Sequence, residues 1–225
     1  FKAYRLQSKL VLVTTLALLA GGFLYFALYE FRLPQWQALS LGEKLQAAVF
    51  QAVTTRTAGF NTVDLANLSA PSQLLTILLM LVGGSPGSTA GGFKTTTLAV
   101  LLLSVRAVFR RRDSAQCFGR RLPDDSLRSA SAIFMLYLVL FLTGGMLICC
   151  IDGISLMNAL FESASAIATV GLSIVGTAGL SVPSKAILIF LMYFGRVGGL
   201  TLIYAVNTNG SVSMSQYPQE RVTVG

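Results

Sequence analysis

The chain has 225 residues, of which 54% are hydrophobic and 12% are charged, and its mean hydropathy is +0.70. A soluble domain carries about twice that charged fraction. Because long apolar runs recur along the whole chain, composition excludes a soluble protein with one buried helix and predicts an integral membrane protein. The sequence has no histidine and three cysteines, so we expect no metal site other than for a transported ion, no disulfide framework and no covalently bound cofactor.

The first half of the sequence predicts a spanning helix, a short helix and a broken span. About twenty apolar residues cross the hydrocarbon core as a helix, and residues 10–29 form such a run. Residues 43–55 favour a helix but are too short to cross, which indicates a re-entrant segment. An apolar run over residues 72–82 is then interrupted by a Gly-rich stretch and resumes over residues 95–109.

The second half predicts a similar order. Residues 130–151 form a second full span, and residues 156–168 are again helix-prone and short. Residues 184–206 form a third long run, which we expect to be interrupted at Gly195 and Arg196. In both halves the short segment lies between spans and ends in a small, Gly-containing motif. This order is typical of a pore helix followed by a filter strand.

The distribution of basic residues predicts the orientation of these spans. Cytoplasmic loops are enriched in Lys and Arg. With the first span running outward, eleven of the seventeen basic residues are cytoplasmic: Lys2, Arg5, Lys9, Arg106, Arg110, Arg111, Arg112, Arg120, Arg121, Arg128 and Arg221. Four are external: Arg32, Lys44, Arg56 and Lys185. We therefore expect four spans, two pore loops entering from outside, a cytoplasmic N-terminus and tail, and no nucleic-acid partner for the net charge of +8.

An internal repeat supports the same layout. A shift of 112 residues places Thr57 on Thr169, Pro71 on Pro183 and Gly83 on Gly195. Chance similarity of apolar sequence is the alternative, but a proline at a helix start has a structural reason. The predicted division is a repeat over residues 1–112, a cytoplasmic basic linker over 113–129, a second repeat over 130–208 and a cytoplasmic tail over 209–225. Since the chain begins at Phe1 and not at Met, we expect an internal fragment.

The motifs after the two short helices are candidate ion-binding strands. A cation in a membrane can exchange its water shell for backbone carbonyls of an extended strand, and such a strand needs glycine where φ is positive. The C-terminal ends of the preceding helices would also favour a cation. A pair of glycine helix caps is the alternative. The candidate filter residues are Thr57, Ala58, Gly59, Thr169, Val170 and Gly171.

The Gly-rich interruption is a candidate gate loop. Irregular backbone is tolerated at membrane depth only where protein buries it or water reaches it. A phosphate-binding loop is excluded because Phe93 separates Gly92 from Lys94, and no strand precedes the segment. The candidate loop residues are Gly83, Gly84, Ser85, Pro86, Gly87, Ser88, Thr89, Ala90, Gly91 and Gly92.

Four charged residues near these motifs have two interpretations each. Arg196, at membrane depth, either faces the loop as a barrier or anchor, or ties helices together. Lys94 either faces the gate or extends to cytoplasmic water. Asp64 either concentrates cations at the outer mouth or is a solvated loop residue or a cap, and the second interpretation is favoured. Glu162 either pairs with Arg56 or lies near external water.

Taken together, the motif over residues 50–62, the Gly-rich stretch over 83–92 and the segments 161–173, 195–198 and 217–221 resemble the Trk/Ktr/HKT superfamily of potassium transporters, KtrB-type subunits in particular. The resemblance implies an all-α membrane protein in which four helix–pore loop–helix repeats form a pseudo-tetrameric pore. This chain is similar to the third and fourth repeats, with the second helix of its first repeat broken by the Gly-rich loop. Gly59 and Gly171 would be filter glycines, and residues 83–92 would be the intramembrane gate.

The same resemblance implies a potassium-uptake subunit of the plasma membrane and not an enzyme. Its implied partners are the upstream half of the pore, a second subunit in a homodimer and a cytoplasmic nucleotide-binding ring of KtrA or TrkA type. Potassium would be the transported ligand, with sodium as a possible co-ion. A sodium-coupled or sodium-permeable member is one alternative, although both filter positions carry Gly and not Ser. A non-conducting membrane scaffold is the other, and it would not need paired filter motifs.

Overall fold

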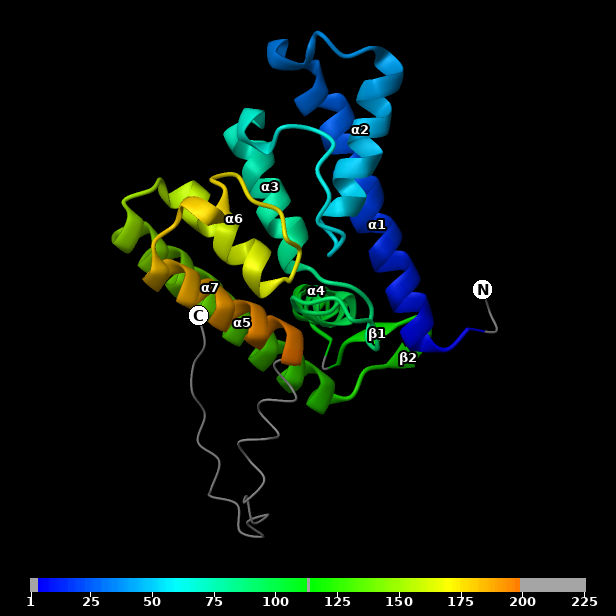
Figure 1. Ribbon diagram of the computed structural model, residues 1–225. Coiled ribbons are helices and arrows are strands. Elements are labelled where there is room, and N and C mark those ends of the chain that lie inside the picture. Colours follow the sequence, from blue (N-terminus) through cyan, green and yellow to red (C-terminus); the bar gives the residue numbers. More distant parts are fainter. Residues whose placement is uncertain (1–3, 113, 199–225) are drawn as a thin grey trace.

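The computed structural model describes residues 4–112 and 114–198, which fold almost entirely into helices (Figure 1). The helices of the first half are α1 (Leu6–Leu28), α2 (Leu41–Thr54), α3 (Ala70–Leu81) and α4 (Thr95–Phe109). Those of the second half are α5 (Asp124–Asp152), α6 (Leu156–Ile167) and α7 (Val182–Val197). Short 3-10 helices are η1 (Glu30–Arg32), η2 (Pro34–Trp36), η3 (Leu65–Asn67) and η4 (Thr177–Gly179). A small antiparallel hairpin joins α4 to α5 through β1 (Gln116–Cys117) and β2 (Arg120–Arg121).

Several helix limits differ from those expected. Helix α5 begins at Asp124, inside the segment expected as a linker, because Pro123 stands at its N-cap and two aspartates occupy its first turn, where the helix dipole favours negative charge. The expected interruption at Gly195 and Arg196 is wrong, since α7 continues through both to Val197. A single glycine leaves the helical hydrogen bonds intact, whereas a proline would not. The rest of this expected span and the tail, residues 199–225, lie outside the described residues.

Two helices have the length and composition needed to cross a membrane. The segment Leu6–Arg32, which contains α1, reaches a mean hydropathy of 2.1, and α5 reaches 2.4. Only 17% and 28% of these apolar windows are buried inside the protein. Most of their apolar surface therefore faces outward, as it would toward lipid tails. Helices α3 and α4 are also apolar but shorter.

Helix α6 is the buried centre of the second half. It packs against α3, α5 and α7, while α2 packs against α1, and α5 and α7 run side by side (Figure 1). Ser155 caps α6 by accepting a hydrogen bond from the Asn158 backbone N–H at 3.3 Å. Phe161 and Ile167 are fully buried, and small residues on α6 allow close packing of its neighbours. The end of α6 is thereby held at the middle of the fold.

The break between α3 and α4 is closed by backbone hydrogen bonds. Val82 and Phe93 form an isolated bridge, in which the Gly83 N–H donates to the Phe93 carbonyl at 2.8 Å and the Phe93 N–H donates to the Leu81 carbonyl at 3.2 Å. These bonds satisfy backbone groups that a helix would otherwise pair. In Figure 1 α3 runs down the page, whereas α4 is seen end-on, so the break changes the direction of the chain.

An acidic residue at or just after the end of each long helix binds the start of a later helix. Glu30 is fully buried and accepts hydrogen bonds from Ser72 Oγ at 2.6 Å and from Trp36 Nε1 at 2.9 Å. It also accepts from the Ser69 N–H, at the N-cap of α3, at 3.1 Å. In the second half Asp152 accepts from the Ser181 N–H, at the N-cap of α7, at 3.2 Å. These contacts fix where α3 and α7 begin.

Candidate functional site

The first candidate filter segment follows the C-terminus of α2. Thr57 and Gly59 have positive φ values of 65° and 77°, with Ala58 between them. The N–H groups of Ala58 and Gly59 both donate to the Thr54 carbonyl at 3.2 Å. The Thr54 hydroxyl donates to the Phe60 carbonyl at 2.7 Å and accepts from the Phe60 N–H at 2.9 Å. Thr54 therefore holds both ends of the turn.

The second candidate segment has the same alternation of φ values. Thr169 has a φ of 52° and Gly171 a φ of 93°. The Val170 N–H donates to the Ser165 carbonyl at 2.9 Å, and the Gly171 N–H donates to Ser165 Oγ at 3.1 Å. A β-branched residue at positive φ is strained, and such strain concentrates at functional sites. Sequence reasoning assigned positive φ to the glycines and missed it at the two threonines.

The two segments meet in space although they are far apart in the sequence. A Cβ built on Gly59 would lie 2.0 Å from the Val170 carbonyl oxygen, so no side chain fits there. Around Gly171 no atom of the described residues lies within 4 Å of the corresponding position. The backbone of Gly59 thus lies against the Val170 carbonyl, where the segments that follow α2 and α6 meet.

Glu162 organises the chain that follows the second segment. Its side chain is 3% exposed, and Oε1 accepts hydrogen bonds from Ser173 Oγ at 2.6 Å and from the Ile174 N–H at 3.0 Å. Neither expected role is found, because the described residues contain no ion pair between Glu162 and Arg56 and the carboxylate is buried. Asp64 caps η3 by accepting from the Ala66 N–H at 3.0 Å, as the favoured interpretation held.

The Gly-rich loop, residues 83–92, is docked against the end of α6. The Gly91 N–H donates to Thr169 Oγ1 at 3.0 Å, and the Gly92 N–H donates to the Ile167 carbonyl at 3.3 Å. A Cβ on Gly91 would lie 2.7 Å from the Ala168 carbonyl oxygen, so the close approach requires glycine. The loop therefore touches the second candidate filter segment directly.

Three cationic side chains hold the loop through its carbonyls. Arg196 donates to the Thr89 carbonyl, and Lys94 Nζ donates to the Ala90 carbonyl at 2.5 Å. From the position just before the first candidate filter segment, a guanidinium nitrogen of Arg56 donates to the Gly83 carbonyl at 3.1 Å. The sequence did not predict the Arg56 contact, because nothing local connects residue 56 to residue 83.

Two cavities near the loop share Arg196 in their lining, and loop residues line one of them. One, of about 430 Å³, is bounded by loop residues together with Tyr137 and Gly195. The other, of about 420 Å³, is bounded by Glu162 and by Thr169 and its neighbours. Arg196 thus lies between a space beside the second candidate filter segment and a space lined by the loop.

Comparison of the sequence with known proteins finds a matching family and similar proteins. Residues 6–215 match the TrkH family, described as a cation transport protein. The chain is 35% identical over 230 residues to the potassium/sodium uptake protein NtpJ of Enterococcus hirae, with 100% of this chain and 51% of that protein covered. It is 34% identical over 226 residues to the Ktr system potassium uptake protein B of Vibrio alginolyticus, with 100% and 50% covered.

A solved structure agrees with the fold. The potassium transporter TrkH from Vibrio parahaemolyticus superposes with a TM-score of 0.70 at 23% identity, covering 89% of this chain and 44% of that one. At this identity the likeness concerns the fold alone. The chain spans about half the length of the relatives that it matches.

Proposed function

Because this chain belongs to the TrkH family of cation transport proteins, we propose that it contributes half of a pore for potassium uptake across the cell membrane. The family is one of integral membrane transporters, and two apolar helices here are long enough to cross. The similar proteins from Enterococcus and Vibrio are named for the uptake of potassium or of potassium and sodium. Ions would pass along the carbonyls of two filter strands, residues 57–59 and 169–171.

The meeting of the two strands is the observation that carries this proposal. Each follows the C-terminus of a short helix and alternates positive φ at Thr and Gly. The approach of Gly59 to the Val170 carbonyl supports an arrangement in which both strands line one ion path. Carbonyl dipoles can replace the hydration shell of a cation without a net charge. A non-conducting scaffold would have no use for paired strained strands.

The length of the relatives supports a further half of the proposed pore. Since this chain covers 51% of NtpJ, the proposed pore needs an upstream half with two further strands, and residues 57–59 and 169–171 would belong to its third and fourth repeats. The whole subunit would be a multi-pass protein with the basic α4–α5 segment and the tail in the cytoplasm. We further propose a homodimer and a cytoplasmic nucleotide-binding ring as regulatory partner.

The docked loop is the proposed gate. It lines one of two cavities that share Arg196, and it is held by Arg56 from just before one filter strand, by Thr169 from the other and by Arg196 from α7. Its release would open a path between the cavity beside the second strand and the cavity that the loop lines. Arg196 adds positive charge on this route, which opposes cation entry while the loop is closed.

Sodium is the second candidate ion. The name of NtpJ includes both potassium and sodium, and the chain is as similar to that protein as to the Ktr subunit. Glycine at positions 59 and 171 favours potassium in our proposal, because it keeps the strand carbonyls free to point at the ion.

Growth of potassium-uptake-deficient cells at low potassium tests the proposed transport. The full-length protein should restore growth, and Gly59→Ser should abolish the rescue at equal membrane expression. Gly42→Ser is the matched control, because Gly42 lies in the first turn of α2 with no atom within 4 Å of its added Cβ. A rescue indifferent to Gly59→Ser would refute the filter.

The gate is tested separately by Arg196→Ala and by shortening residues 83–92. Both changes remove a contact that holds the loop, so potassium flux into vesicles should rise several-fold. Lys185→Ala, which loses only a bond to the Ala178 carbonyl far from the loop, should leave the flux unchanged. Unchanged flux in both gate variants would contradict the gate while leaving the filter intact.

A further inference from the structure

An apolar groove with a basic rim runs between α1 and α4. It has a volume of about 540 Å³. Its walls are the side chains of Leu10, Val13 and Ala17 from α1 and of Leu102 and Leu103 from α4. At one end the groove is lined by Arg106, Arg110 and Arg112.

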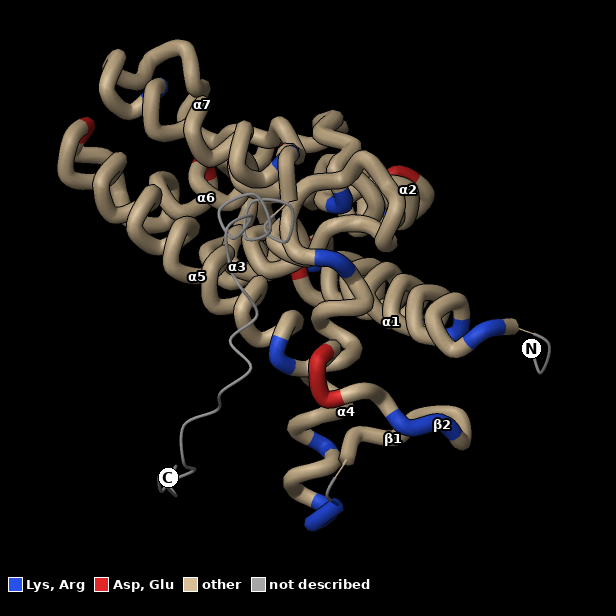
Figure 2. Tube along the Cα trace, turned by 90° about the horizontal axis from the view of Figure 1, so that it is seen from below, with Lys and Arg blue, Asp and Glu red and all other residues tan. Residues whose placement is uncertain are grey.

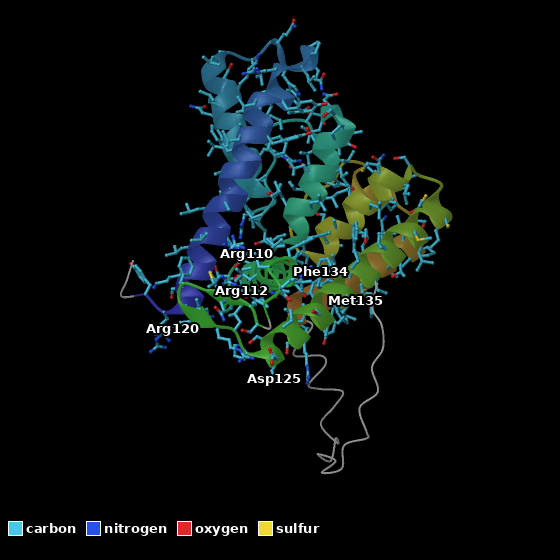
Figure 3. All side chains as sticks on the ribbon, turned by 180° about the vertical axis from the view of Figure 1, so that it is seen from behind. Arg110, Arg112, Arg120, Asp125, Phe134 and Met135 are labelled. Atoms are coloured by element: carbon cyan, nitrogen blue, oxygen red, sulfur yellow. The ribbon has the colours of Figure 1, made fainter. Side chains whose placement is uncertain are left out.

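The rim is strongly cationic. Residues 106–121 contain six arginines and one acidic residue, Asp113, which lies outside the described residues. Arg106, Arg110 and Arg112 are exposed, and the one ion pair found within residues 4–112 and 114–198 joins Arg121 to Asp124. Figure 2 shows the basic positions along the end of α4 and the hairpin, and Figure 3 shows Arg110 and Arg112 near each other. The rim therefore has charge available for an anion.

Large apolar side chains next to the arginines indicate a bilayer interface. Val108 is 73% exposed and Phe109 is 85% exposed, directly before Arg110. Phe118 of the hairpin also lines the groove, and the Lys9 ammonium lies 5.7 Å from its ring centroid. Exposed aromatic and apolar groups beside cations suit the headgroup level of a membrane and not the surface of a water-soluble partner.

The depth of the groove matches one leaflet. Helix α1 begins at Leu6, and the groove extends along it from Leu10 to Ala17. At a rise of about 1.5 Å per residue, the lining lies about 6 to 16 Å from the start of the helix. One half of a hydrocarbon core of about 30 Å is about 15 Å thick. An acyl chain lying along this wall would therefore stay within one leaflet, and the arginines that line the same groove are available to its phosphate.

From these observations we propose that the groove is a binding site for an anionic phospholipid of the leaflet on the side of the basic loop. Arg106, Arg110 and Arg112 bind the phosphate, because guanidinium groups form paired hydrogen bonds to phosphate oxygens. The apolar walls of α1 and α4 bind an acyl chain. Since α4 begins at Thr95, two residues after the Phe93 bridge of the gate loop, an occupied site would also fix the helix to which that loop is joined.

Native mass spectrometry of the full-length protein with phosphatidylglycerol or phosphatidylcholine of equal chain length tests this site. The triple variant R106Q/R110Q/R112Q should lose affinity for phosphatidylglycerol by roughly a hundredfold, about fivefold for each arginine near the phosphate. The control R111Q/R120Q/R128Q removes the same charge from the same side without touching the groove lining and should change affinity less than tenfold. Unaltered elution on size exclusion shows that each variant is folded.

A second variant separates the groove from general charge attraction. Ala17→Phe fills the apolar wall without changing charge and should weaken phosphatidylglycerol binding about tenfold. Equal binding of the two lipids, or equal losses in the two arginine triple variants, would overturn the proposal. So would exclusion of lipid from the groove by the upstream half of the protein or by a regulatory subunit. None of these outcomes depends on transport, so the proposed pore could fail while the lipid site stands.

Discussion

The two halves of the chain share one order of helices but differ in how the helix after the candidate filter segment, α3 or α7, ends. In the second half α7 runs unbroken past the end of α6, and a Cβ on Gly195 would lie 1.9 Å from the Ile167 carbonyl oxygen. In the first half the returning helix stops at Leu81, and the loop that follows reaches the same carbonyl through the Gly92 N–H. The continuous helix α7 packs Gly195 against the Ile167 carbonyl, whereas the broken segment between α3 and α4 donates a backbone N–H to it.

The halves also differ in how tightly their strands are supported. In the first, Thr54 holds the strand through a hydroxyl bonded to Phe60, and in the second the buried carboxylate of Glu162 holds the chain just after the strand, at Ser173 and Ile174. The carboxylates that bind the starts of α3 and α7 differ as well. Glu30 accepts from several donors and is fully buried, whereas Asp152 has one oxygen without a partner in the described residues. We therefore expect substitutions of residues with similar roles in the two halves to have unequal effects.

The largest difference is expected between the two filter glycines. Gly59→Ala places a Cβ 2.0 Å from the Val170 carbonyl and also strains a φ of 77°, so potassium uptake should fall at least about a hundredfold. Gly171→Ala meets no atom within 4 Å and suffers only the strain of its φ of 93°, about 1 to 3 kcal/mol, so uptake should fall about tenfold. Rubidium uptake by cells expressing the full-length variants measures both, and equal losses would contradict the unequal packing.

A second comparison concerns the stability of the two halves. Glu30→Gln keeps the shape but replaces a charged acceptor by an amide that must place an NH₂ among donors, so we expect a loss of about 2 to 4 kcal/mol. Asp152→Asn should cost about 1 kcal/mol or less, since it has one backbone donor, Ser181, at 3.2 Å. Thermal unfolding of the full-length protein in detergent measures the difference, and a larger effect at Asp152 would reverse the comparison.

The smallest expected difference lies in the strand supports. Glu162→Gln should lower potassium-over-sodium selectivity about tenfold, because a buried charged acceptor is lost beneath the second strand. Thr54→Val should lower it a few-fold, since its two hydrogen bonds are neutral. Thr143→Val is the control, because its exposed hydroxyl bonds within α5 to the Val139 carbonyl. Flux ratios in vesicles would contradict this account if Thr143→Val matched either variant.

Much of the helix order could be predicted from the sequence because it depends on local pattern. Apolar runs of spanning length, short segments ending in glycine, and the Gly-rich interruption are each visible within a few residues. The roles of residues 57–59 and 169–171 as filter strands stay predictions. The motif Ser-x-Pro-Ser begins at both Ser69 and Ser181. It could have indicated the hydrogen bonds to Glu30 and Asp152, but it was not used for that prediction.

The remaining features could not be predicted because they depend on contacts between distant segments. The positive φ of Thr57 and Thr169 is imposed by hydrogen bonds to the ends of α2 and α6 and not by residue type. The contact from Gly91 to Thr169 joins residues 78 apart. Helix α7 continues through Gly195 because that glycine allows close packing on Ile167, a reason that the sequence alone does not contain.

In the proposed pore, strands from both halves surround one line of ions. Anomalous diffraction from crystals of the full-length protein grown in rubidium can locate these ions, since rubidium replaces potassium. We expect rubidium peaks between the carbonyls of residues 57–59 and those of residues 169–171. Peaks that contact only one of these strands, or lie away from both, would contradict the proposed pore.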